Sequence, residues 1–162
     1  MTAAAVERWN ALSREEAVKQ IRTCCGSTEW ARRMEEARPF RGIADLLDAA
    51  DRVWRSLPET DRMEAFQKHP RIGEETSGQA GEEQAGTRGA SAAAREALAR
   101  ANRDYEEKFG RIFLVCATGK TAEEMLALCR ERLHNDAETE MRVAAEEQRK
   151  ITRLRLEKLF GG

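Results

Sequence analysis

The sequence predicts an all-α fold, a single compact multi-helix domain that covers residues 1–162. Its composition is one reason: alanine, glutamate, arginine and leucine are abundant, whereas aromatic residues make up 6% and there are only three prolines. The helical spacing of apolar residues and the repeated helix-capping pairs are two more. With 162 residues, 41% of them hydrophobic, the chain can build one continuous core without disulfides or metals.

The first half of the chain predicts a series of helices. A capping box opens a helix at Ser13, and Gly26 ends it. A second, short helix begins at Ser27 or Thr28 and ends before the Arg-Pro-Phe break at residues 38–40.

The most regular apolar pattern runs from Ile43 to Leu57 and predicts a core helix of four turns. Pro58 then restarts the chain into a further short helix. That helix is expected to end at His69-Pro70, because the residue before a proline disfavours the α region.

In the second half, a helix of about 18 residues is expected to end near Phe109, with a segment of distinctive composition on either side of it. Residues 71–90 contain five glycines and almost no large apolar side chain, which predicts a surface connection or lid. Residues 112–117 are almost purely apolar and lie between two glycines, which predicts a short, buried, extended segment.

The chain closes with two predicted helices. Thr121 and Glu124 form a capping box that opens the first, which extends to Leu133. The last runs from about 137 to 160, with its charged side chains expected on a solvated face. No internal repeat or linker supports a domain boundary.

The charges argue against polyanionic partners. The chain has 28 basic and 29 acidic residues and a net charge of −1, so no strong field attracts nucleic acid or a membrane surface. No stretch approaches the roughly 20 apolar residues of a membrane span, and the N-terminal residues contain no signal-peptide core. We therefore expect a cytoplasmic protein with no nucleic-acid and no membrane partner.

The cysteines and histidines lack the spacing of a metal or redox site. Two of the four cysteines, Cys24 and Cys25, are adjacent and the others are isolated, while the histidines, His69 and His134, lie far apart. We expect reduced core cysteines and metal-independent chemistry.

Four features are candidates for chemistry, and each has a plain structural alternative. His69 titrates near neutrality and the following proline fixes its direction, although a capping or surface role is the commoner one for such a histidine. Residues 82–84 can converge on a polar ligand or form a solvated loop. Arg132 can hold a carboxylate or urea-like group, or only favour the end of its helix. The backbone of residues 112–116 can bind the edge of a ureide, or form a core strand.

Motifs along nearly the whole chain resemble those of the 2-oxo-4-hydroxy-4-carboxy-5-ureidoimidazoline (OHCU) decarboxylase family. They are CCGS at 24–27, RPF at 38–40, EAFQKHPRIG at 64–73, EEQAG at 82–86, FGRIFLVCATGK at 109–120 and RLHND at 132–136. The succession of HPRIG, EQAG and CATGK is highly specific, whereas any one of them alone is not. The resemblance implies an all-α homodimer that converts a small ureide, OHCU, to (S)-allantoin and CO2. Such a carboxy-lyase acts after urate oxidase and hydroxyisourate hydrolase in purine catabolism and needs no cofactor.

The resemblance also implies roles for individual residues. His69 and Glu83 match the catalytic positions. The substrate-binding positions are matched by Pro70, Ala80, Gln84, Ile112, Phe113, Leu114, Val115, Cys116 and Arg132. Many family members have a serine where this chain has Ala80, so a hydroxyl contact to the substrate is missing, and our hypothesis is that Ser77 compensates for it.

The implied reaction needs position and charge control from the protein, because the substrate carries its own electron sink, an imine carbon beside the carbon that bears the carboxylate. His69, with Glu83, either takes the hydroxyl proton or delivers a proton to one face of the intermediate. Two alternatives remain. One is a non-catalytic helical interaction module in which His69 is only a cap, and the other is a different ureide-processing enzyme, such as an allantoin hydrolase or racemase.

Overall fold

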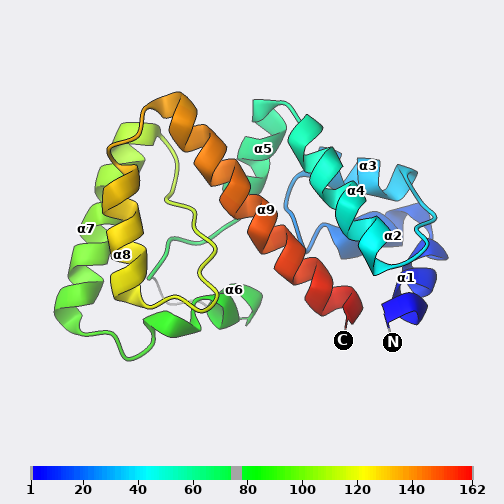
Figure 1. Ribbon diagram of the computed structural model, residues 1–162, viewed down its shortest axis with the longest axis horizontal. Helices are drawn as coiled ribbons and strands as arrows, with labels where there is room; N and C mark the ends of the chain where they lie inside the picture. The colour runs from blue at the N-terminus through cyan, green and yellow to red at the C-terminus, as the bar shows by residue number, and fades with distance from the viewer. Residues whose placement is uncertain (1, 74–77, 162) are drawn as a thin grey trace. The chain divides into compact units, whose positions relative to one another are not determined.

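A computed structural model describes residues 2–73 and 78–161, and in these residues the fold is all-α, as predicted, with no strand. The elements are α1 (Thr2–Asn10), α2 (Arg14–Ile21), α3 (Thr28–Glu36), α4 (Ile43–Ser56), α5 (Glu59–Phe66), α6 (Gly78–Glu83), the 3-10 helix η1 (Ala85–Thr87), α7 (Ala92–Phe109), α8 (Ala122–Arg132) and α9 (Ala137–Gly161) (Figure 1). They form two compact units, residues 1–65 with 149–162, and residues 66–148. The single domain over residues 1–162 therefore stays a prediction.

The first unit is built around buried tryptophans. The Trp9 ring stacks on Phe40 and meets the edge of Phe160, with 6.0 Å between ring centroids in both pairs. The indole N–H of Trp30 donates to the carbonyl of Ala50 at 3.2 Å, which joins α3 to α4. Trp9 lies on α1, a helix that we did not predict, because its buried face consists of little more than Val6 and Trp9.

The helix ends in this unit follow local hydrogen bonding. The Ser13 hydroxyl accepts from the backbone N–H of Glu16, which is one of the two hydrogen bonds of the predicted capping box. Ser27, rather than Thr28, caps α3. α2 ends at Ile21, short of the predicted end at Gly26. The Thr23 hydroxyl donates to the carbonyl of Gln20 at 2.7 Å, an arrangement that competes with continuation of the helix.

The second unit places α7 and α8 side by side (Figure 1). α7 has its predicted length of 18 residues and ends at Phe109, and its C-cap is Gly110, whose positive φ of 73° suits glycine. The capping box of Thr121 and Glu124 is present at the start of α8. The buried core of this unit comprises Ile72, Leu98, Ala101, Tyr105, Phe113, Val115, Ala117, Ala122, Met125 and Cys129.

Residues 112–117 form neither helix nor strand, and from Phe113 onward they are buried, as predicted for this segment. Within residues 71–90, which we expected to form a surface connection or lid, the structure contains α6 and η1, two short helices that the sequence did not predict. Close backbone packing replaces apolar side chains there. A Cβ atom on Gly86 would lie 1.9 Å from the carbonyl oxygen of Lys120, so this approach requires glycine.

α9 begins where the sequence predicts, with the Asp136 carboxylate accepting from the backbone N–H of Thr139 at 2.7 Å. Its charged residues do not all face solvent, contrary to our expectation. Glu140 is 0% exposed and Glu147 is 8% exposed, because both carboxylates accept hydrogen bonds from other elements of the second unit. The four cysteines are thiols rather than disulfides and are buried, as predicted.

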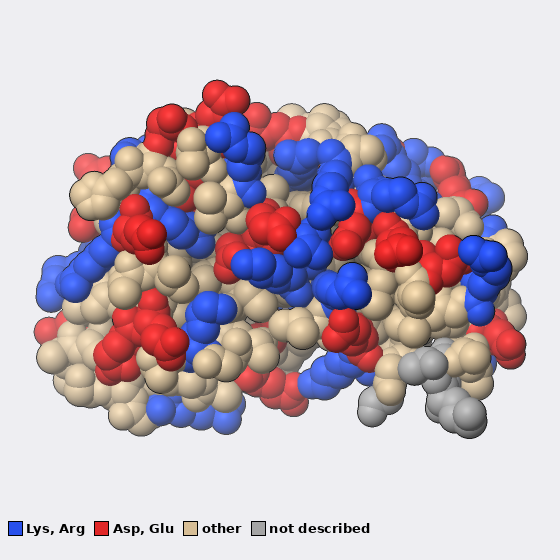
Figure 2. All heavy atoms as spheres, in the orientation of Figure 1, with Lys and Arg blue, Asp and Glu red and all other residues tan. Residues whose placement is uncertain are grey.

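The surface carries charges of both signs, which intermix over the face shown in Figure 2. This pattern agrees with the near-zero net charge of the sequence. Within the described part of the chain, none of the helices has the length and apolar character needed to cross a membrane.

Candidate active site

His69 follows the end of α5 by three residues and is held from α9. Its backbone N–H donates to the carbonyl of Phe66 at 3.3 Å, and its half-buried ring brings Nε2 to 2.6 Å from Oε1 of Gln148. Gln148 is 0% exposed. Because an amide oxygen only accepts, Nε2 carries the hydrogen in this arrangement, and in a neutral ring Nδ1 is then an acceptor.

Glu147, which precedes Gln148 on α9, binds the extended segment of residues 112–116. The backbone N–H of Cys116 donates to Oε1 of Glu147 at 3.0 Å, and the carbonyl of Cys116 accepts from Nζ of Lys120 at 2.7 Å. Two consecutive side chains of one helix therefore fix His69 and the end of the 112–116 segment. The structure thus brings these two predicted parts of the site together.

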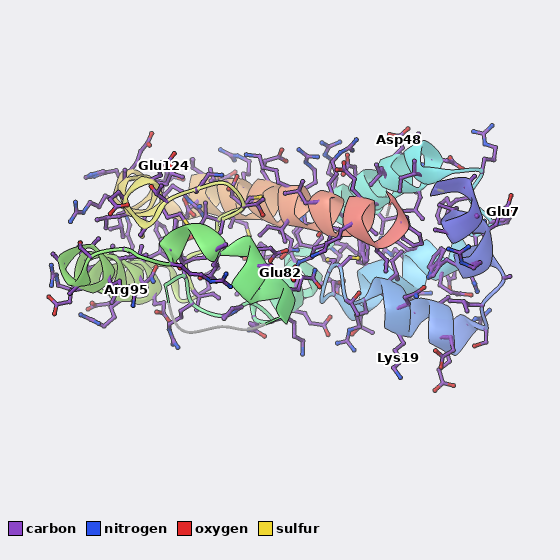
Figure 3. The ribbon with its side chains drawn as sticks, turned by 90° about the horizontal axis from the view of Figure 1, so that it is seen from below. Glu7, Lys19, Asp48, Glu82, Arg95 and Glu124 are labelled. Atoms are coloured by element: carbon purple, nitrogen blue, oxygen red, sulfur yellow. The ribbon has the colours of Figure 1, made fainter. Side chains whose placement is uncertain are left out.

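α6 adds the acidic and amide residues. Gln84 is buried, and its Oε1 accepts from the backbone N–H of Gly73 at 3.0 Å, which ties the end of α6 to the chain that follows His69. Glu83, the last residue of α6, is half-buried. Glu82 is exposed, and Figure 3 labels it on the same helix. Of the residues 82–84, Glu83 and Gln84 are therefore the better placed for a site.

The thiol of Cys116 reports on the charges in this region. Burial is the main cause that raises its pKa, and the carboxylates of Glu147 and Glu83 raise it further, whereas the Lys120 ammonium lowers it. The carboxylate of Glu83 therefore lies within electrostatic range of the segment that Glu147 holds. Because the pKa lies above its ordinary value, the thiol is protonated at neutral pH and Cys116 is not equipped to act as a nucleophile.

Arg132 is the last residue of α8 and lies in a buried network of hydrogen bonds. All three guanidinium nitrogens donate: Nε and Nη2 to Glu140, and Nη1 to the carbonyl of Leu114 at 2.7 Å. The guanidinium also lies 4.7 Å from the ring centroid of Phe113, and the Tyr105 hydroxyl donates to Glu140. Burial and that hydrogen bond raise the pKa of Tyr105. In this structure Arg132 supports the extended segment, and its contact with a substrate stays a prediction.

The other predicted residues are distributed along the same elements. Pro70, Ala80 and Ile112 are half-buried, whereas Phe113, Leu114 and Val115 are buried. Ser77 lies outside the described residues, so its role in place of a serine at position 80 stays a hypothesis. Among the described residues, no group of three or more histidine, cysteine or acidic side chains is placed to hold a metal ion.

Sequence reasoning missed Glu147, Gln148 and Lys120. Gln148 offered a signal, because it falls on the inward stripe of α9 with Ala144, Ala145 and Ile151, and a polar residue on such a stripe needs a partner. Glu147 and Lys120 offered none, since each stands in a run of charged or polar residues.

Comparison with known proteins identifies the family. The model of the OHCU decarboxylase family matches residues 10–157. The chain belongs to the OHCU decarboxylase family. A curated relative, the 2-oxo-4-hydroxy-4-carboxy-5-ureidoimidazoline decarboxylase of Amia calva, is 33% identical over 131 residues, which cover 76% of this chain and 75% of that protein.

Two longer relatives of the family are described as bifunctional. The uric acid degradation bifunctional protein TTL of Arabidopsis thaliana is 38% identical over 86% of this chain and 46% of its own length. The uric acid degradation bifunctional protein of Bacillus sp. (strain TB-90) is 26% identical over 96% of this chain and 32% of its own length. The chain therefore spans less than half the length of either relative.

Solved structures share the OHCU decarboxylase fold. A crystal structure of an OHCU decarboxylase in the presence of (S)-allantoin matches with a TM-score of 0.79 and 38% sequence identity, over 88% of this chain and 98% of that chain. A crystal structure of (S)-allantoin synthase matches with a TM-score of 0.74 at 18% identity, over 96% of this chain and 54% of that chain, and supports the fold alone.

Proposed function

We propose that this chain decarboxylates OHCU to (S)-allantoin and CO2, as a carboxy-lyase in urate degradation. The observation that carries the proposal is the match to an OHCU decarboxylase that was crystallised in the presence of (S)-allantoin, at 38% identity over 98% of that chain. The site supports it as well, because His69 and the segment ending at Cys116 are fixed by neighbouring residues of α9.

The chemistry follows from the substrate. The bond between the ring carbon and its carboxylate breaks, and the electron pair moves into the adjacent imine, which leaves an enol-like intermediate and CO2. The former imine nitrogen takes up a proton, the hydroxyl loses its proton, and the former imine carbon gains one, which gives allantoin. The protein has to orient the ring, stabilise the intermediate and protonate a single face.

Residues of this chain suit those tasks. Nε2 of His69 is hydrogen-bonded to Gln148, so the ring has a defined tautomer and direction for a proton transfer at Nδ1. We assign this transfer to His69, with Glu83 acting beside it. Pro70, Ala80, Gln84 and the 112–116 segment form the substrate walls in this proposal, and Arg132 contributes through its hold on Leu114.

We also propose an oligomeric state, a place in urate degradation and a cellular location for the enzyme. The family resemblance favours a homodimer that receives its substrate after urate oxidase and hydroxyisourate hydrolase have acted. Composition favours a cytoplasmic protein without nucleic-acid or membrane partners. Sedimentation equilibrium at micromolar concentration tests the dimer, and a mass of one 18.3 kDa chain would contradict it.

The activity is tested by following the carboxylate carbon. Urate oxidase and hydroxyisourate hydrolase generate OHCU in situ from ¹³C-labelled urate, and NMR follows the release of labelled CO2 with and without this chain. The proposal predicts release that accelerates with the concentration of the chain. Release at the spontaneous rate would contradict it and would favour the interaction module. Hydrolysis or racemisation of added allantoin by the chain would instead favour the other ureide-processing enzyme.

A further inference from the structure

Arg111 presents buried donors beside the candidate catalytic histidine. The residue lies between Gly110 and Ile112, at the start of the extended segment, and its side chain is half-buried. Among the residues that the structure describes, neither Nε nor Nη2 of its guanidinium has a hydrogen-bond partner, although both atoms are buried. An unpaired buried N–H is costly, and its persistence in a native fold calls for a partner that binds there.

The surroundings indicate where that partner lies. Arg111 lines a pocket of about 360 Å³ whose wall also includes His69 and Ile112. The guanidinium centre is 5.7 Å from the ring centroid of Phe109, which limits the directions in which it can turn. The pocket therefore joins a cation with two unpaired donors to two parts of the candidate site.

The acidic residue in the pocket wall is already neutralised. Glu106 lines the pocket, but both of its carboxylate oxygens accept from Arg71, at 2.9 to 3.1 Å. Its charge is thus balanced by a fork of donors from outside the pocket. Within the described ranges, Arg111 forms no ion pair, which favours a negatively charged group as the ligand of this pocket.

We propose that Arg111 binds the carboxylate of the substrate in this pocket, with His69 facing the adjoining ring carbon. The identity of the ligand rests on the proposed function, since OHCU carries a carboxylate that (S)-allantoin lacks. Two N–H groups of a guanidinium fit the two oxygens of a carboxylate. Arg111 is a binding residue in this proposal.

The proposal has a kinetic signature. Decarboxylation removes the negative charge from the carboxylate as CO2 departs, so Arg111 stabilises the bound substrate more than the transition state. Arg111→Gln is expected to raise KM by about tenfold or more while kcat stays unchanged or rises, because ground-state binding is what the substitution removes. Inhibition by (S)-allantoin, which has no carboxylate, is expected to change by less than about twofold.

Arg100→Gln is the matched control, because it removes one positive charge from an exposed position of α7 and is expected to change neither KM nor kcat. Arg111→Lys keeps the charge but loses the fork of donors, and an intermediate KM is expected. A KM for Arg111→Gln equal to that of the parent, or an equal loss of affinity for substrate and allantoin, would overturn the proposal.

The thermal midpoint of unfolding distinguishes substrate binding by Arg111 from a structural role. Removing donors that have no partner is expected to leave the thermal midpoint unchanged or raise it, whereas a fall of several degrees would contradict the proposal. Calorimetric titration tests carboxylate binding by Arg111 independently of whether the chain catalyses decarboxylation. If the parent shows no turnover, the proposed function fails. The titration then tests only whether Arg111 binds a carboxylate. The probe is allantoate, a ureide with a carboxylate, which should then bind the parent at least tenfold more tightly than Arg111→Gln.

Discussion

At the residue scale, the proton transfer assigned to His69 depends on the side-chain amide of Gln148, which orients the imidazole ring. The 2.6 Å contact between Nε2 and Oε1 of Gln148 fixes one tautomer, and the buried position of Gln148 leaves little freedom to the pair. A neutral histidine in the other tautomer would present a donor at Nδ1 instead of the acceptor that removal of the hydroxyl proton requires in our proposal. Gln148 is thus a positioning residue for His69.

Replacing Gln148 by leucine tests this dependence. We expect kcat to fall by about 10- to 100-fold, because the ring loses the acceptor that orients it. The ¹⁵N shifts of the imidazole should show a single Nε2–H tautomer in the parent and a mixture in Gln148→Leu. Arg142→Gln, on the exposed face of the same helix, is the control and should leave both readouts unchanged. An unaltered tautomer in the leucine variant would contradict the positioning role.

At the element scale, the site depends on close contacts between short segments rather than on long helices. α6 and η1 approach the loop before α8 so closely that Gly86 has no room for a Cβ atom beside the carbonyl of Lys120.

Gly86→Ala is therefore expected to displace the segment that carries Glu83 and to lower both activity and stability. Gly42→Ala is the matched control, since its Cβ would meet nothing within 4 Å and its φ of 176° is open to alanine. Equal thermal midpoints for the two variants would show that the contact is not needed.

The network beneath the extended segment gives a second prediction at this scale. Glu140 is 0% exposed and Arg132 is 6% exposed, so Arg132→Ala leaves a buried carboxylate without its cation. We expect a loss of about 3 to 5 kcal/mol in the free energy of unfolding, measured by urea denaturation.

The pair of Arg142 and Glu138 serves as the comparison, because both side chains are largely exposed. Its loss through Arg142→Gln should cost less than about 1 kcal/mol. If Arg132→Ala keeps the stability of the parent and changes only KM, the arginine contacts the substrate and does not support the segment.

At the scale of the whole molecule, buried thiols link stability to alkaline pH. Burial raises the pKa of Cys25 to about 11 and that of Cys129 to about 11, from an ordinary 9.0. Below pH 9 both the folded and the unfolded chain hold these protons, and the full stability is present. Between about pH 9 and 11 the unfolded chain releases them first, so the free energy of unfolding falls as the pH rises. Urea denaturation at each pH measures this, and a curve that stays flat up to pH 11 would contradict it.

The sequence alone predicts the all-α class and the long helices, because apolar periodicity and capping pairs are local signals. It predicts α7 and α9 closely, since each has a cap and a clear end. It did not predict α1 or α6, which have too few apolar positions to form a pattern. Glu147 and Arg111 were missed for another reason: their importance comes from what they face in space, and no sequence spacing records that.

The most direct test of the account is the handedness of the allantoin formed. Circular dichroism follows a reaction in which urate oxidase and hydroxyisourate hydrolase supply OHCU to the parent chain, to His69→Gln or to no protein. We predict rapid formation of (S)-allantoin with the parent, and a rate at least about 100-fold lower with His69→Gln. A parent reaction that yields only slow, racemic product would contradict the decarboxylase function. A His69→Gln variant as fast and as selective as the parent would contradict the assignment of proton transfer to His69.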